Sequence, residues 1–259
     1  MHWSTNTQDL SDYDQANYKQ ILVDVPRTMP EYPIFSLTPI QSMLRRILFI
    51  WNMRHPGSGY VQGINDLCLP FLVTYLNDYF KVSLTDASVS KKGLEEMGPE
   101  KLELIEADVY WCLCKVIDNS QDVYTAYQAG AQKMIARIKE ILKRVNGNLY
   151  YHIVSKEVDF MHFAFRWINC FLLREFPLDR AVRMWDTYIS EEESFAEFHV
   201  YVCTAFLVHW EKEILEKEFP LLLTFLQSLP TQDWTEEDIG ILMGSAYQYK
   251  VMFHKTKHL

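Results

Sequence analysis

Apolar residues recur at the spacing of an α-helix in nearly every long segment, and this period constrains the fold more than any other feature. In segment 39–54 they occupy the positions i, i+3, i+4, i+7, i+8 and i+11: Ile40, Met43, Leu44, Ile47, Leu48 and Trp51. One face of such a helix is apolar and must be buried. Thr38 is a suitable N-cap residue, and Pro39 suits the first helical turn. The pattern predicts a core-facing helix over 39–54.

Several other segments carry helical signals. After Glu157 the apolar period returns, and we expect that helix to end near Pro177. Residues 200–210 are apolar almost all round, which predicts a helix enclosed by others. Thr235 and Asp238 have the spacing of a capping box. Further helices are expected over 99–117, 131–145, 178–188, 221–229 and 236–253.

The composition favours a globular all-α fold. The 259 residues include 9 Gly and 10 Pro, below the usual shares of about 7% and 5%, which disfavours turn-rich β architectures. No fixed repeat of 20 to 50 residues suggests a solenoid. We therefore expect an all-α domain with no significant β-sheet. The segment 81–101, rich in Ser, Lys and Glu, is interpreted as a surface loop or insertion.

Charge, hydropathy and cysteine content exclude several functional classes. With 25 Lys and Arg against 34 Asp and Glu, the net charge of −9 disfavours nucleic acid and anionic lipid as partners. No apolar run reaches the ~18 residues of a membrane span, and no signal-peptide pattern begins the sequence, so we expect a cytoplasmic protein without a transmembrane segment. The five cysteines lack the pairing of a zinc site, and we expect neither disulfides nor a metal site.

The segment from Ile21 to Arg27 can present a fixed cation. Pro26 disfavours helical backbone at Val25, which predicts a rigid break that projects Arg27 after a helix. Asp24 lies three residues earlier, and a nearby carboxylate can hold the guanidinium in one orientation before it grips an anion. The alternative is an ordinary surface ion pair, which contributes about 0 to 1 kcal/mol.

The segment from Tyr60 to Leu67 can orient a water molecule. Gln62 and Asn65 are three residues apart at an expected helix start, and therefore share a face. The uncharged amide of a glutamine both donates and accepts hydrogen bonds, which suits it to position a nucleophilic water. The alternative is that Gln62 and Asn65 only cap a helix after a glycine turn.

Other candidate sites have simpler interpretations. Gly57, Gly59 and Gly63 have the wrong spacing for a nucleotide-binding loop and follow a helix, so we interpret them as turn residues. The cations between residues 133 and 144 fit the solvated face of an amphipathic helix. The eight histidines are scattered, and no catalytic triad is evident.

Taken together, the two polar segments resemble the paired signature of TBC-domain GTPase-activating proteins, which act on Rab GTPases. Two motifs carry the resemblance: Ile21-x-x-Asp24-x-x-Arg27 and, 33 residues later, Tyr60-x-Gln62. Residues 165–186 are similar to the third conserved block of the family. HPGSGYVQGINDL at 55–67 and FHVYVCTAFLVHW at 198–210 are most similar to a subgroup that includes a Golgi-acting yeast member and its animal relatives.

The resemblance implies one two-lobed helical TBC domain over residues 1–259, with a groove that receives the switch regions of a Rab. The N-terminal lobe, over about 10–145, would bear the catalytic residues, and the C-terminal lobe would cover about 146–259. No cofactor of its own is implied, because the Rab carries GTP and Mg²⁺. The oligomeric state and the identity of the Rab stay open.

Residue roles follow from the same resemblance. Arg27 would be an arginine finger and Gln62 a glutamine finger, both supplied in trans to the Rab. Asp24 would orient Arg27. Catalytic support and Rab contact would come from Ile21, Asp24, Tyr60, Gly63 and Asn65. Trp185 and Asp186 would brace the C-terminal lobe.

The expected function is therefore activation of GTP hydrolysis by a GTP-bound Rab, with no reaction of its own. The alternative is a non-catalytic Rab-binding or scaffold module with the same fold. The resemblance also implies a role in vesicle trafficking, in the cytoplasm or at Golgi and other endomembranes through the bound Rab.

Overall fold

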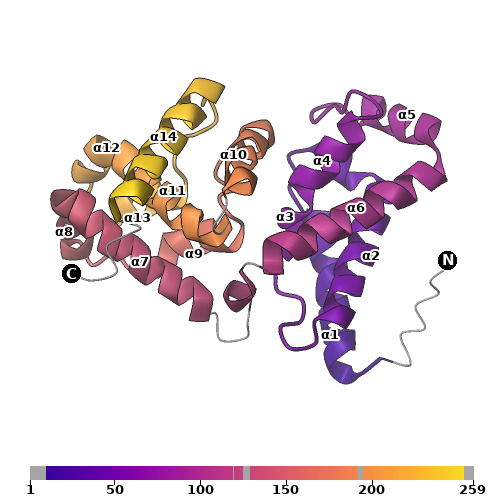
Figure 1. The fold of residues 1–259 in the computed structure, drawn as a ribbon, viewed down its shortest axis with the longest axis horizontal. Coiled ribbons are helices and arrows are strands. Elements are labelled where there is room, and N and C mark those ends of the chain that lie inside the picture. Colours follow the sequence, from indigo (N-terminus) through magenta and orange to yellow (C-terminus); the bar gives the residue numbers. More distant parts are fainter. Residues whose placement is uncertain (1–9, 119, 125–128, 192–194, 254–259) are drawn as a thin grey trace. The chain divides into compact units, whose positions relative to one another are not determined.

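The computed structural model describes residues 10–118, 120–124, 129–191 and 195–253. These residues form helices and turns without a β-strand (Figure 1), which confirms the all-α prediction. Contacts between residues divide the chain into two compact units. Unit 1 comprises residues 1–118 and 124–126, and unit 2 comprises 119–123 and 127–259.

Unit 1 contains six α-helices and two short 3₁₀ helices among its described residues. They are α1 (Asp12–Asp24), η2 (Val25–Arg27), η3 (Pro33–Ser36), α2 (Thr38–Arg54), α3 (Ile64–Leu67), α4 (Leu69–Asn77), α5 (Ala87–Met97) and α6 (Pro99–Asp118). Helix α2 contacts both α1 and α6, and it buries the apolar face that its sequence period indicates. Its first residue is Thr38, so the cap position falls on Leu37 instead.

Unit 2 is built around α11. Its elements are η4 (Gln121–Tyr124, whose last residue falls in unit 1), α7 (Ala129–Val145), α8 (Gly147–Ser155), α9 (Met161–Asn169), α10 (Leu178–Ser190), α11 (Phe195–His209), α12 (Glu211–Leu215), α13 (Leu221–Gln227) and α14 (Glu236–Phe253). Helix α11 contacts α7, α9, α10 and α14, and all its residues from Phe198 to Leu207 are buried. The prediction of an enclosed helix is confirmed.

The contact-defined units divide near residues 118–127, and the lobe boundary of about 145 that the resemblance implies stays a prediction. Helix α7 contacts α8, α9 and α11, so its packing assigns it to unit 2. The capping box at the start of α14 is present: the Thr235 hydroxyl accepts from the Asp238 N–H at 3.3 Å, and Asp238 Oδ2 accepts from the Thr235 N–H at 2.7 Å.

Segment 81–101 is not the loop that its composition suggested, because it contains α5. Asp86 caps this helix by accepting a hydrogen bond from the Ser88 N–H at 2.8 Å. Leu94 is buried, and a Cβ on Gly93 would lie only 2.4 Å from the Phe80 ring. The polar composition belongs to the exposed face of α5, while a narrow apolar face packs inward.

Helix α9 is shorter than predicted, ending at Asn169 rather than near Pro177. Phe171 and Leu172 have φ of 46° and 62°, so the chain leaves the helical conformation there. Both side chains are fully buried, and the Phe171 ring packs edge-on against Trp185 and Phe195. The apolar residues after Asn169 therefore indicate burial in the core. They do not indicate that the helix continues, because non-helical residues are buried there as well.

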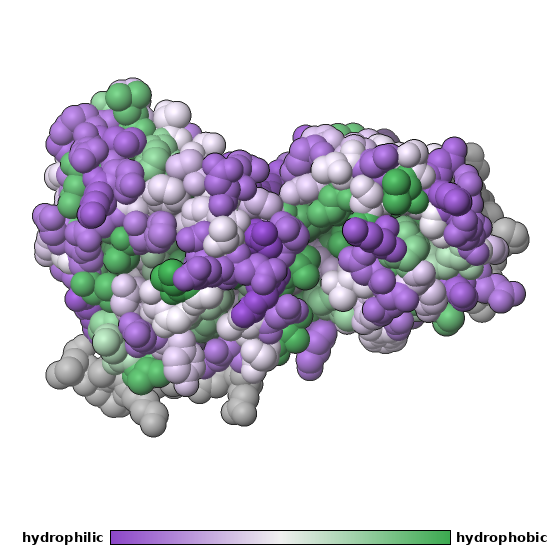
Figure 2. Space-filling view, turned by 90° about the horizontal axis from the view of Figure 1, so that it is seen from above, coloured by the Kyte–Doolittle hydropathy of each residue, from purple (hydrophilic) through white to green (hydrophobic). Residues whose placement is uncertain are grey.

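The described residues bear on the expectations for membrane spans, cysteines and metal sites. Figure 2 shows hydrophilic residues interspersed with small hydrophobic areas on the face it presents. Among the described helices none is both long and apolar enough to cross a bilayer. All five cysteines are free. In the described ranges no cluster of His, Cys, Asp and Glu has the makings of a metal site.

A histidine is completely buried in unit 2, between Tyr188 and Trp167. The Tyr188 hydroxyl lies 2.8 Å from His199 Nδ1, and His199 Nε2 lies 3.1 Å from the Trp167 carbonyl oxygen. The carbonyl can only accept, so Nε2 carries the proton and Nδ1 accepts from Tyr188. Complete burial lowers the pKa of His199 to about 3, against an ordinary value of 6.5.

We predict that the free energy of unfolding falls as the pH decreases from about 6.5 to 3. In that window the unfolded chain binds a proton at His199 that the native state excludes, so stability is fully present only above pH 6.5. His199→Gln keeps a donor and an acceptor but does not titrate. Urea unfolding across this range should show a flatter pH dependence for this variant, and identical slopes would contradict the account.

Candidate functional site

The turn after α1 presents Arg27. Pro26 has no N–H to continue the helix, and the chain tightens into the 3₁₀ helix η2, where the Thr28 N–H donates to the Val25 carbonyl at 3.2 Å. Val25 itself keeps right-handed helical backbone, at φ −56° and ψ −45°, so the predicted departure from helical backbone at this residue is wrong. The side chains of Ile21 and Val25 are fully buried, so this turn packs against the core.

Asp24 holds Arg27 from behind. Arg27 Nε and Nη2 both donate to Asp24 Oδ1, at 3.0 and 2.5 Å. The Asp24 side chain is 1% exposed, whereas the Arg27 side chain is 51% exposed. Asp24 Oδ1 therefore binds the edge of the guanidinium formed by Nε and Nη2. The Nη1 group stays available to donate to an anion. The predicted contact between Asp24 and Arg27 is present.

Tyr60 connects this turn to the second motif. Its hydroxyl donates to Asp24 Oδ2 at 2.9 Å and lies 3.1 Å from Asn65 Oδ1. The hydroxyl has one proton, and the charged carboxylate is the stronger acceptor for it. Burial, and then the Asp24 charge, raise the pKa of Tyr60 well above its ordinary value, so the donor stays protonated.

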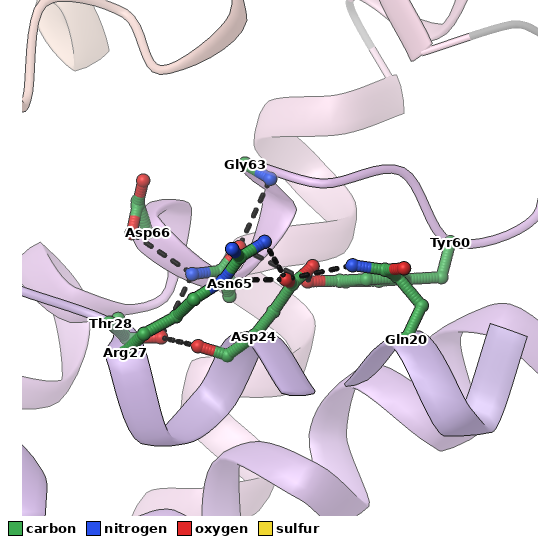
Figure 3. Close-up of polar contacts among 8 residues, drawn as sticks. All are labelled: Gln20, Asp24, Arg27, Thr28, Tyr60, Gly63, Asn65 and Asp66. Atoms are coloured by element: carbon green, nitrogen blue, oxygen red, sulfur yellow. Dashed lines mark hydrogen bonds and ion pairs between the residues drawn. The ribbon is translucent and has the colours of Figure 1, made fainter. Parts of the chain in front are cut away.

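Asn65 completes a closed set of hydrogen bonds behind Arg27, drawn in Figure 3. Its Oδ1 accepts from the Gly63 N–H at 3.0 Å, and its Nδ2 donates to Thr28 Oγ1 at 2.9 Å and to Asp66 Oδ1 at 3.0 Å. The Thr28 hydroxyl donates to the Asp24 carbonyl at 3.0 Å. These bonds fix the orientation of the amide and tie both motifs into one buried network.

Gln62 is exposed in the turn between the buried residues Tyr60 and Gly63. Helix α3 begins only at Ile64, so Gln62 does not share a helical face with Asn65 as predicted. Gly63 has φ of 108°, a backbone conformation that favours glycine. The two anchored neighbours therefore hold a turn from which the Gln62 side chain faces outward.

The base of this turn is held by residues that no motif predicted. The buried Asn52 Oδ1 accepts from the Tyr60 N–H at 2.9 Å and from Asn17 Nδ2 at 2.8 Å. Gly59 has φ of 64°, and a Cβ there would lie 2.0 Å from the Tyr13 hydroxyl. The turn thus packs closely against α1. This packing is visible only in the tertiary structure and has no signal in the sequence.

The third block of the sequence lies in unit 2 and serves packing. Trp185 is 1% exposed, and its Nε1 donates to the Phe171 carbonyl at 3.2 Å. Arg166 forms a two-pronged pair with the buried Glu175, at 2.7 and 2.8 Å. These contacts fit a bracing role for Trp185. Asp186 is exposed.

We predict that Tyr60→Phe lowers the free energy of unfolding by about 1.5 to 3 kcal/mol, because the buried Asp24 carboxylate loses a donor. Denaturant unfolding would measure this change. Tyr79→Phe is the matched control, since Tyr79 is 47% exposed and surface changes stay within about 0.5 kcal/mol. Equal stability of the two variants would show that the Tyr60 hydroxyl does not support Asp24.

Comparison with known proteins identifies relatives of this chain. Over residues 2–215 the chain matches the family model of the Rab-GTPase-TBC domain. It is 46% identical to TBC1 domain family member 22B of Homo sapiens, over 93% of this chain and 47% of the relative. It is 42% identical to the GTPase-activating protein gyp1 of Schizosaccharomyces pombe, over 97% of this chain and 48% of the relative.

A solved structure is similar as well. The crystal structure of the Ypt/Rab-GAP domain of Gyp1p superposes with a TM-score of 0.88 and 41% identity, covering 95% of this chain and 76% of that one. The chain spans about half the length of the curated relatives it matches. Relatives of the yeast and animal subgroup are those that the sequence resemblance indicated. The chain belongs to the Rab-GTPase-TBC domain family.

Proposed function

We propose that this domain activates GTP hydrolysis by Rab GTPases and contributes Arg27 and Gln62 in trans. One observation carries the proposal: a half-exposed arginine is held by a buried aspartate, which Tyr60 connects to the turn that bears Gln62. A surface ion pair without function needs no such buried support. Both side chains are exposed on the same unit.

Arg27 would neutralise charge in the transition state. During phosphoryl transfer, negative charge spreads over the equatorial oxygens and the leaving oxygen, and an arginine supplied in trans accelerates hydrolysis by about 10³- to 10⁵-fold. That factor corresponds to about 4 to 7 kcal/mol of barrier. Because Asp24 fixes the guanidinium beforehand, less orientational freedom is lost when the arginine enters the nucleotide site.

Gln62 would position the attacking water. Its amide offers an acceptor for the water proton and a donor for a phosphate or backbone group, without carrying charge. The anchored neighbours Tyr60 and Gly63 limit the freedom of the turn. This arrangement suits a group that must meet the water in one geometry.

The names of the relatives support this activity. The Schizosaccharomyces pombe relative is called a GTPase-activating protein, and the solved relative is a Rab-GAP domain. GTP and Mg²⁺ would be carried by the Rab, and the domain would need no cofactor of its own. We place the domain in the cytoplasm, recruited to Golgi or other endomembranes by its GTP-bound Rab, with a role in vesicle trafficking.

The test is single-turnover GTP hydrolysis by a panel of purified Rab GTPases. We predict that the wild-type domain stimulates at least one Rab, that Arg27→Ala lowers the stimulated rate by about 10³-fold or more, and that Gln62→Ala lowers it by about 10²-fold. Circular dichroism should show that both variants keep their helical content.

Matched controls separate catalysis from general surface effects. Arg46→Ala removes another ion-paired arginine of similar exposure, 48% against 51%. Gln248→Ala removes an exposed glutamine of α14. Both should retain full stimulation. Tight binding of a GTP-loaded Rab without faster hydrolysis would instead support a non-catalytic Rab-binding module, and loss of helical content in Gln62→Ala would support a capping role.

A further inference from the structure

We infer that Gln20, which lies outside both motifs, is a positioning residue that aims Arg27 by fixing the carboxylate of Asp24. The inference rests on the proposed function. Gln20 Nε2 donates to Asp24 Oδ1 at 2.9 Å, the same oxygen that accepts from Arg27 Nε and Nη2. Figure 3 shows Gln20 approaching Asp24 from the previous turn of α1.

The Asp24 carboxylate needs such support because it rotates easily about its Cβ–Cγ bond. Rotation of an aspartate carboxylate about the Cβ–Cγ bond has broad, shallow minima, unlike the staggered wells of other torsions. Arg27 is bound through a single oxygen, Oδ1, so any rotation of that group swings the guanidinium with it. The orientation of the Arg27 guanidinium is therefore fixed only as well as the plane of the Asp24 carboxylate is fixed.

Two donors from outside the pair fix this plane, one at each oxygen. Tyr60 donates to Oδ2 at 2.9 Å, and Gln20 donates to Oδ1. With Tyr60 alone, the carboxylate could pivot about Oδ2 and carry Oδ1 away. Arg27 pairs with Oδ1 alone, while Tyr60 binds Oδ2, so the guanidinium lies side-on to the carboxylate.

The helical spacing explains why Gln20 can do this. Gln20 and Asp24 are four residues apart on α1, where side chains of a helix meet, and a Gln to Asp hydrogen bond is one of the favourable pairs. Gln20 is exposed and carries no charge. Its amide therefore donates to Asp24 Oδ1 without adding a second positive charge beside Arg27.

The first test measures the motion of Arg27 directly, without a GTPase. In ¹⁵N relaxation of the Arg27 Nε–H group, assigned through its loss in Arg27→Lys, the wild-type group should be rigid. Gln20→Met keeps the length and helix preference of the side chain but removes the donor. We predict that it lowers the order parameter of Arg27 Nε–H toward values below about 0.6. The matched control Lys19→Met, at the neighbouring exposed position, should leave it unchanged.

The second test separates positioning from binding. With a stimulated Rab, Gln20→Met should lower kcat by about 2- to 12-fold, the loss of one hydrogen bond, while KM for the Rab stays unchanged and circular dichroism shows a folded domain. Gln20→Glu should lower kcat further, because a second carboxylate competes with Asp24 for Arg27.

The outcomes are distinguishable. An unchanged order parameter and kcat in Gln20→Met would overturn the inference. A higher KM with unchanged kcat would also overturn it, because Gln20 would then be a contact for the Rab. If no Rab responds to the wild-type domain but Gln20→Met still mobilises Arg27, the proposed function fails and the positioning of Arg27 by Gln20 stands.

Discussion

The buried carboxylate of Asp24 is the interaction on which the rest of the site depends. A charge that is 1% exposed must find partners within the protein, because an unpaired buried ion costs several kcal/mol. Its partners come from three places in the sequence: Gln20 on α1, Arg27 on η2 and Tyr60 beyond α2. Satisfying one carboxylate thus joins two segments that lie 33 residues apart.

This arrangement explains how side chains of the domain could assist catalysis in a partner, as proposed. The polar network is buried, whereas Arg27 and Gln62, the groups proposed to act on the Rab, are exposed. Asn65 and Thr28 close the network so that the backbone of both turns is held. Rigid support below exposed side chains reduces the ordering cost of forming a productive complex.

Much of this could be predicted from the sequence, because helical period and motif spacing are local signals. Helix α2, the enclosed α11 and the capping box of α14 follow directly from them. Predictions failed where distant contacts decide: Val25 stays helical, α5 forms despite its polar composition, and α9 ends where Phe171 turns into the core. Gln20 and Asp24 have a local i, i+4 spacing, but the role proposed for Gln20 also depends on Tyr60 from another segment. Asn52 likewise depends on distant side chains and backbone, which no local pattern brings together.

The central claim is that Arg27 enters the nucleotide site of a Rab while Asp24 still holds it. The most direct measurement is a crystal structure of the domain with a responsive Rab that carries GDP, Mg²⁺ and a planar mimic of the transferred phosphate, which captures the transition-state geometry. We predict that the Arg27 guanidinium lies within hydrogen-bond distance of the mimic, with Nε still donating to Asp24. A complex in which Arg27 points away from the nucleotide would contradict the account.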